Sequence, residues 1–77
     1  MHKGGEKLNN KLIAQKLIEL RGEKSRETVA KACNISVSAL AMYEQGERIP
    51  RYDIKIKLAK FYKRSVNYIF FAHNEHG

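Results

Sequence analysis

Residues 25–46 read SRETVAKACNISVSALAMYEQG, and this stretch decides the fold. Ser25 and Ser36 are good helix N-caps, and each is followed by apolar residues at helical spacing. Asn34 lies between the two helices that these serines would start, and asparagine is second only to glycine in adopting the left-handed conformation that ends a helix. Two short helices joined by residues 34–36 are typical of a helix-turn-helix.

Apolar residues also recur at helical spacing on both sides of this stretch. Ile13 and Leu17 begin one stripe, which predicts a helix from about Lys11 to Arg21. Two further helices are predicted, one over residues 52–62 and one after Ser65. No segment alternates apolar and polar residues long enough for a half-buried strand. The sequence therefore predicts a compact all-α domain of five helices.

Length and composition bound the architecture. The chain has 77 residues with a net charge of +7, which leaves room for one domain. We assign residues 10–71 to that domain, residues 1–9 to a flexible N-terminal lead-in and residues 72–77 to a C-terminal tail. No apolar run approaches the ~20 residues that span a membrane. Cys33 has no second cysteine to pair with, which fits a reducing cytoplasm, and the basic excess favours nucleic acid as partner.

Six segments in this order resemble the Cro/phage-repressor type of helix-turn-helix, the XRE family, which has a lambda-repressor-like fold. The segments are LIELR (17–21), SRETVA (25–30), NISVSALAMYEQG (34–46), RIP (48–50), LAKFY (58–62) and SVNYIF (65–70). The resemblance implies a transcriptional regulator that binds double-stranded DNA with its third helix in the major groove. A homodimer on a palindromic operator is expected, because one half-site would bind weakly.

The same resemblance implies roles for individual residues. Four residues of the third helix would lie at base edges: Val37, Ser38, Ala39 and Met42. Ser38 alone among them can hydrogen-bond a base, and the other three would contact thymine methyl groups. Six residues would lie at DNA phosphates: Ser25, Arg26, Ser36, Gln45, Arg48 and Arg51. Arg21 and Glu44 would form a structural ion pair that joins the first helix to the end of the third.

Four features depart from the family pattern. The link over residues 22–24 is short, and Asn34 replaces the usual glycine. Glu47 lies where a basic residue is common, and this weakens the expected phosphate contacts there. Arg64 lies where an apolar residue usually precedes the last helix.

Several residues keep two interpretations at this point. Val37 and Met42 would either contact bases or pack into the core. Phe70 and Phe71 are adjacent, so a single helix face cannot bury both well. One of them would be exposed, as at a subunit interface, or the tail would cover it. The basic run Lys55, Lys57, Lys60, Lys63 and Arg64 would be a solvated face or would attract DNA or a partner non-specifically. Residues 46–64 carry a net charge of +5, so we expect charge to set affinity and the apolar third helix to set specificity.

The function that these features favour is a repressor of a phage or mobile-element operon. Two alternatives are an antitoxin that autoregulates its operon and a protein-interaction module that has lost DNA binding. We interpret Cys33 as a small buried hydrophobe, and His73 and His76 as solvated rather than metal-binding. The chain has no nucleophile–base set, no paired carboxylates and no phosphate-binding glycine loop, so we expect no catalysis. The sequence indicates no cofactor, metal or small-molecule ligand.

Overall fold

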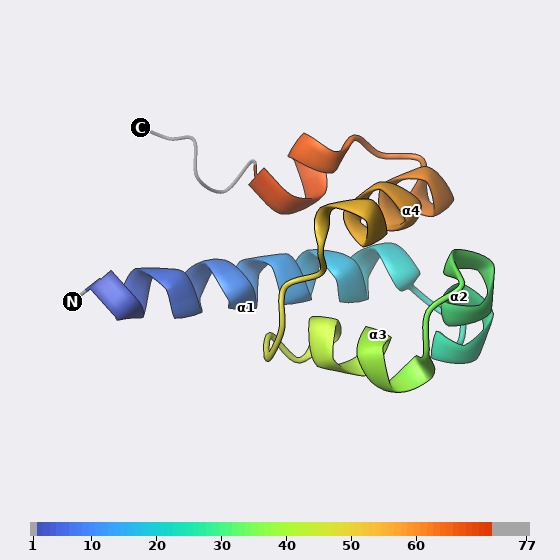
Figure 1. Ribbon diagram of the computed structural model, residues 1–77, viewed down its shortest axis with the longest axis horizontal. Coiled ribbons are helices and arrows are strands. Elements are labelled where there is room, and N and C mark those ends of the chain that lie inside the picture. Colours follow the sequence, from blue (N-terminus) through green and yellow to red (C-terminus); the bar gives the residue numbers. More distant parts are fainter. Residues whose placement is uncertain (1, 72–77) are drawn as a thin grey trace.

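A computed structural model describes residues 2–71, with side chains from Asn9 onward. Its elements are α1 (His2–Arg21), α2 (Arg26–Cys33), α3 (Val37–Glu44), α4 (Tyr52–Tyr62) and η1 (Asn67–Phe71). In Figure 1, α1 runs through the middle of the molecule, with α3 on one side of it and α4 and η1 on the other. The described residues contain no strand, so the predicted all-α fold of five helices is confirmed. Met1 and residues 72–77, which include the predicted tail with His73 and His76, lie outside the described residues.

The first helix is longer than the sequence predicts. It begins at His2 rather than at about Lys11, so the backbone is helical over residues that we expected to form a flexible lead-in. Each glycine within a helix costs about 1 kcal/mol relative to alanine, and Gly4 and Gly5 argue against helix here. The packed turns downstream supply the helix nucleus, after which every added residue gains one backbone hydrogen bond. These first turns extend beyond the other helices (Figure 1).

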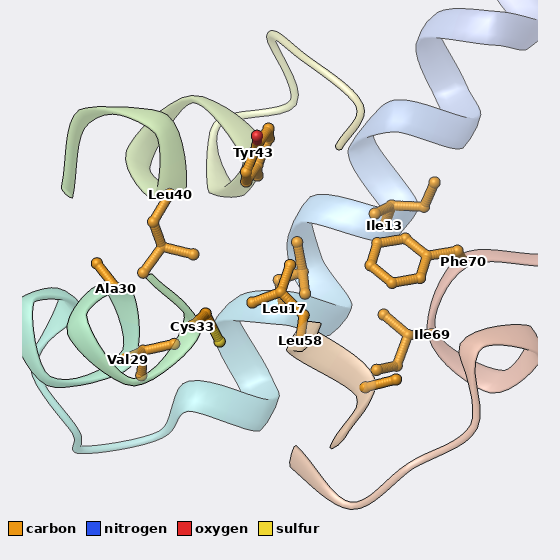
Figure 2. Packing of buried hydrophobic residues seen from close by; sticks show 11 residues of the cluster. Ile13, Leu17, Val29, Ala30, Cys33, Leu40, Tyr43, Leu58, Ile69 and Phe70 are labelled. Atoms are coloured by element: carbon orange, nitrogen blue, oxygen red, sulfur yellow. The ribbon is translucent and has the colours of Figure 1, made fainter. Parts of the chain in front are cut away.

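The core lies where the apolar faces of all five elements meet. Leu17, Leu40 and Leu58 come from three different helices, and each is 0% exposed (Figure 2). The other members of the buried cluster are Ile13, Val29, Ala30, Cys33, Tyr43, Ala59, Ile69 and Phe70. The thiol of Cys33 donates to the carbonyl of Lys57 at 3.7 Å, so this cysteine joins α2 to α4 as a small buried side chain.

Helices α2 and α3 have the caps that the sequence predicts. The Ser25 hydroxyl accepts from the backbone N–H of Thr28 at 3.1 Å, and the Ser36 hydroxyl accepts from that of Ala39 at 3.0 Å. Asn34 adopts the left-handed conformation with φ of 57°. The N–H of Ile35 then bonds the Ala30 carbonyl at 2.9 Å, which closes the end of α2. These local bonds fix the direction in which α3 leaves the turn.

Asn34→Ala is expected to destabilise the domain by about 1 kcal/mol, because a Cβ without a local hydrogen-bonding group is disfavoured at positive φ. Asn34→Gly is the matched control and should change the free energy of unfolding by less than about 0.5 kcal/mol, since glycine adopts this conformation freely. Urea unfolding followed by circular dichroism measures both. Equal stability of the two variants would contradict the left-handed assignment.

The last element is a single π-helical turn rather than the α-helix that the sequence predicts. Ser65 caps it, since its hydroxyl accepts from the backbone N–H of Tyr68 at 3.0 Å. Two consecutive apolar residues of this turn belong to the core cluster. Ile69 and Phe70 are accordingly buried, whereas Phe71 keeps 37% of its surface exposed. Of the two interpretations of the pair, the exposed surface of Phe71 agrees with the first, in which one phenylalanine is exposed.

Candidate nucleic-acid interface

Helix α3 has a buried face and an exposed face. Leu40, Tyr43 and Glu44 are buried, whereas Val37 and Ser38 at the start of the helix are exposed. The 41% exposure of Val37 excludes the interpretation that it packs into the core. The other two predicted base-reading residues are half-buried, and they are Ala39, which packs against the core, and Met42. The most exposed of the four predicted base-reading side chains are therefore the two at the N-terminal end of α3.

The residues predicted to contact phosphates lie at helix starts and in the segment after α3. Five of the six are exposed: Ser25, Ser36, Gln45, Arg48 and Arg51. The sixth, Arg26, is the first residue of α2 and is half-buried. A helix N-terminus favours an anion, because its free backbone N–H groups point toward the bound anion and the positive end of the helix dipole attracts it. The N-terminus of α2 therefore suits a phosphate.

Glu44 connects three helices through two ion pairs. Its side chain is 0% exposed. Arg21 Nε of α1 donates to Glu44 Oε2 at 2.8 Å, so the predicted ion pair is present. Arg26 Nε of α2 donates to Glu44 Oε1, also at 2.8 Å. We call Arg21, Arg26 and Glu44 the Glu44 cluster; it ties the C-terminal end of α3 to the scaffold.

The Arg26–Glu44 pair is a feature that the sequence reasoning missed, because Arg26 was assigned to a phosphate alone. No signal in the local sequence indicated this pair, because it joins residues 18 positions apart whose proximity depends on how α2 packs against α3. The Nε contact fixes the plane of the Arg26 guanidinium. Its side chain remains 36% exposed, and its two terminal amino groups bond no other part of the described chain. They are available to a phosphate.

Arg21 also stabilises the short link between α1 and α2. Its Nη1 donates to the Lys24 carbonyl at 2.9 Å, and the Lys24 N–H bonds the Arg21 carbonyl at 3.0 Å. The hydrogen bond and the negative charge of Glu44 raise the pKa of Arg21, although partial burial acts in the opposite direction. The Glu44 cluster therefore keeps two positive charges at the start of α2 and the end of α1.

The segment after α3 is held against α1. Gly46 has φ of +77°, and its carbonyl accepts from Asn10 Nδ2 at 3.4 Å. A Cβ at this glycine would lie 3.5 Å from the Asn10 carbonyl oxygen. Pro50 is buried, and the exposed Arg48 and Arg51 flank it. The two arginines are therefore presented from a segment whose path is fixed relative to α3.

Tyr62 on α4 places a buried hydroxyl near the Glu44 cluster. No other described group bonds this hydroxyl. Burial raises the pKa of the phenol well above its ordinary value near 10, and the charge of Glu44 adds to the shift. The folded protein therefore holds this proton more tightly than the unfolded chain does, so the stability that Tyr62 contributes is lost as the pH rises above about 10.

Tyr62→Phe is expected to flatten the loss of stability above pH 10. At neutral pH the same change should be neutral or slightly stabilising, because it removes a buried polar group that lacks a partner. Tyr52→Phe is the control, since Tyr52 is 64% exposed. Thermal unfolding between pH 7 and 11 measures both variants. A Tyr62→Phe variant with the wild-type alkaline profile would contradict the assignment.

Among the described side chains, which begin at Asn9 and end at Phe71, no group of three His, Cys, Asp or Glu could hold a metal ion. None of the described helices is both long enough and apolar enough to cross a membrane.

Comparison with known proteins identifies the family. A family model described as helix-turn-helix matches residues 15–69, which include the Glu44 cluster and every predicted DNA contact. No curated protein and no solved structure matches the chain. Members of this family bind double-stranded DNA and are generally not enzymes. Because the match spans well over half of the sequence, the chain belongs to the XRE-type helix-turn-helix family of DNA-binding transcriptional regulators.

Proposed function

We propose that the protein represses a phage or mobile-element operon by binding a palindromic operator as a homodimer. The observation that carries this proposal is the geometry of α3. Its N-terminal side chains are exposed, while Leu40 and the Glu44 cluster hold the rest of the helix against the scaffold. A helix presented in this way can lie in the major groove with its first residues at base edges.

The four residues of α3 proposed to lie at base edges define what the helix can read. Ser38 can donate or accept a hydrogen bond and so tolerates several bases. Val37, Ala39 and Met42 offer only apolar contact, for which the thymine methyl group is the natural partner. Operator sites should therefore contain thymines opposite α3, and part of the specificity would come from DNA shape.

Phosphate contacts would set the orientation of the domain on the duplex. Arg26 is the best-placed residue for this, because Glu44 fixes its guanidinium at the N-terminus of α2. Ser25, Ser36, Gln45, Arg48 and Arg51 would complete the set. Contacts of this kind carry no sequence information but position the residues that do.

A homodimer follows from the size of the reading surface. One short helix with a single hydrogen-bonding side chain reads too few bases for a specific site. Two copies related by a two-fold axis would read half-sites about 10 bp apart.

Selection of bound sites from random duplex DNA tests the proposal. The expected result is enrichment of a two-fold symmetric site with thymines in each half. Val37→Ala and Ser38→Ala should change the preferred bases, whereas Lys31→Gln, at an exposed position on α2, should not. No enrichment over the starting pool would overturn sequence-specific binding, and enrichment of a single asymmetric half-site would overturn the homodimer.

Arg26→Gln is expected to weaken binding to operator and random duplex alike. The loss of one phosphate contact should reduce the slope of log K against log salt by about one. Fluorescence anisotropy over a salt series measures this, with circular dichroism to correct for the folded fraction. A variant that loses affinity for the operator alone would show that Arg26 reads bases instead.

A protein-interaction module is the second candidate, and the uncharged outward face of α3 favours it. Exposed Val37 next to Ser38 would suit a protein surface as well as a groove. This function predicts that Ser38→Ala and Arg26→Gln leave DNA affinity unchanged. The same anisotropy series therefore separates the two functions.

A further inference from the structure

Two cations from distant parts of the chain meet at one exposed ring. Lys16 Nζ of α1 lies 4.5 Å from the centroid of the Tyr68 ring and bonds its hydroxyl oxygen at 3.4 Å. Arg64 Cζ, in the turn after α4, lies 5.1 Å from the same centroid. Tyr68 remains 39% exposed. Attraction to the ring holds the two like charges near each other.

Lys55 extends this arrangement along η1. Its Nζ lies 4.6 Å from the centroid of Phe71 and 5.6 Å from that of Phe70. We call Lys16, Lys55, Arg64, Tyr68 and Phe71 the cation–aromatic surface. The described residues form two ion pairs, and both of them use Glu44. No described carboxylate therefore forms an ion pair with Lys16, Lys55 or Arg64. As far as the described residues go, the surface therefore carries positive charge that no ion pair compensates, on side chains whose positions are restricted by the rings.

The cation–aromatic surface faces away from α3. On α1, Asn10 and Ala14 face Gly46 at the end of α3, and Lys16 lies about 140° around the helix axis from that face. Figure 1 agrees, because η1 and α3 lie on opposite sides of α1. A duplex bound at α3 cannot reach Tyr68 without bending around the domain. These cations therefore cannot serve the contacts already proposed for the operator.

The chemistry of the surface fits a chain of phosphates. Helix α4 and the turn after it carry three further exposed lysines, Lys57, Lys60 and Lys63. Lys57 and Lys60 share a face of α4 that lies about 140–200° around the helix axis from Lys55, so they are not part of the cation–aromatic surface. The cations of the surface itself come from α1, α4 and the turn after α4. Charge spread in this way, rather than gathered in a pocket, suits a linear polyanion. Cations already restrained by aromatic rings lose less side-chain entropy when they bind it.

We propose that the cation–aromatic surface is a second nucleic-acid contact, which binds the phosphate backbone of a DNA duplex other than the one at α3. It is independent of base sequence, since backbone contacts carry no sequence information. With α3 on one side and this surface on the other, one domain would hold two duplex segments together. Acidic proteins and anionic membranes are the competing partners, and the experiment below distinguishes them.

Amide chemical shifts of the ¹⁵N-labelled full chain, titrated with a random-sequence 16-bp duplex at low salt, test the proposal. The expected result is two groups of shifted residues, one in α2 and α3 and one at Lys16 and residues 64–71. Lys16→Gln combined with Arg64→Gln should abolish the second group and keep the first. It should also lower the salt slope for random duplex by about two.

Control variants separate charge from structure. Lys16→Arg combined with Arg64→Lys keeps both charges and should retain the second group of shifts. Lys31→Gln removes an exposed lysine elsewhere and should leave that group unchanged. Thermal unfolding should show that all variants fold.

Three results would overturn the proposal. In the first, the variant that combines Lys16→Gln with Arg64→Gln is folded and still shows the wild-type shifts at residues 64–71. The duplex could shift only α2 and α3. Polyglutamate or vesicles of anionic phospholipid could shift residues 64–71 when the duplex does not, which would assign the surface to those partners. Loss of the α3 shifts alone would instead count against the proposed function and leave this inference standing.

Discussion

Glu44→Gln is expected to lower the free energy of unfolding by about 2–3 kcal/mol. The carboxylate is 0% exposed and accepts from Arg21 and Arg26, so an amide in its place leaves two guanidinium groups without their counter-charge. The amide N–H₂ would also face an arginine donor. The cost lies below the 3–5 kcal/mol typical of broken buried pairs, because both arginines are partly exposed and regain some hydration.

Urea unfolding of Glu44→Gln and of Glu47→Gln measures this effect. Glu47 is exposed and lies three residues away, so its substitution should change stability by less than about 0.5 kcal/mol. A domain of this size has a total stability of roughly 4–10 kcal/mol, so the loss at Glu44 should lower the melting temperature clearly. Equal stability of the two variants would show that the Glu44 cluster does not hold the helices together.

Leu40→Ala is expected to destabilise the domain by about 2–4 kcal/mol. Leu40 is 0% exposed at the centre of α3, and it packs in the cluster that contains Leu17 and Leu58 (Figure 2). Truncation leaves a cavity in a core too small to collapse around it. DNA affinity should fall with the folded fraction, since α3 loses its main apolar contact with the scaffold.

Val37→Ala on the same helix is the matched control. Because Val37 is 41% exposed, its truncation should change the free energy of unfolding by less than about 0.5 kcal/mol. It should instead alter the bases selected from random DNA. Similar destabilisation of both variants, measured by urea unfolding, would mean that the two faces of α3 are assigned wrongly.

Features set by neighbouring residues could be predicted from the sequence. Helix α4 has the predicted bounds, Tyr52 to Tyr62. Ser25, Asn34 and Ser36 adopt the capping roles that their side chains favour. Such features depend on hydrogen bonds within a few residues, so the local sequence contains the information for them. The Arg21–Glu44 pair, in contrast, was predicted from the family resemblance.

Features that depend on distant packing could not be predicted. The Arg26–Glu44 pair joins residues 18 positions apart, and the Lys16–Tyr68 contact joins residues 52 apart. Neither leaves a periodic pattern in the chain. The π-turn of η1 contains Ile69 and Phe70, which both pack in the core with residues of helices far away in the sequence. The predicted start of α1 was wrong because the helix penalty of Gly4 and Gly5 was given more weight than the ease with which an existing helix is extended.

The exposure of Val37 and Ser38 has a consequence for how the protein can change. These two side chains contribute little to the core, while Leu40 and Glu44 fix the helix that carries them. Substitutions at the exposed pair are therefore nearly free of folding cost. Under the function proposed above, in which these residues read bases, a lineage of such proteins can acquire new target sites by exchanging one or two side chains, and a designer can retarget the domain in the same way without repacking it.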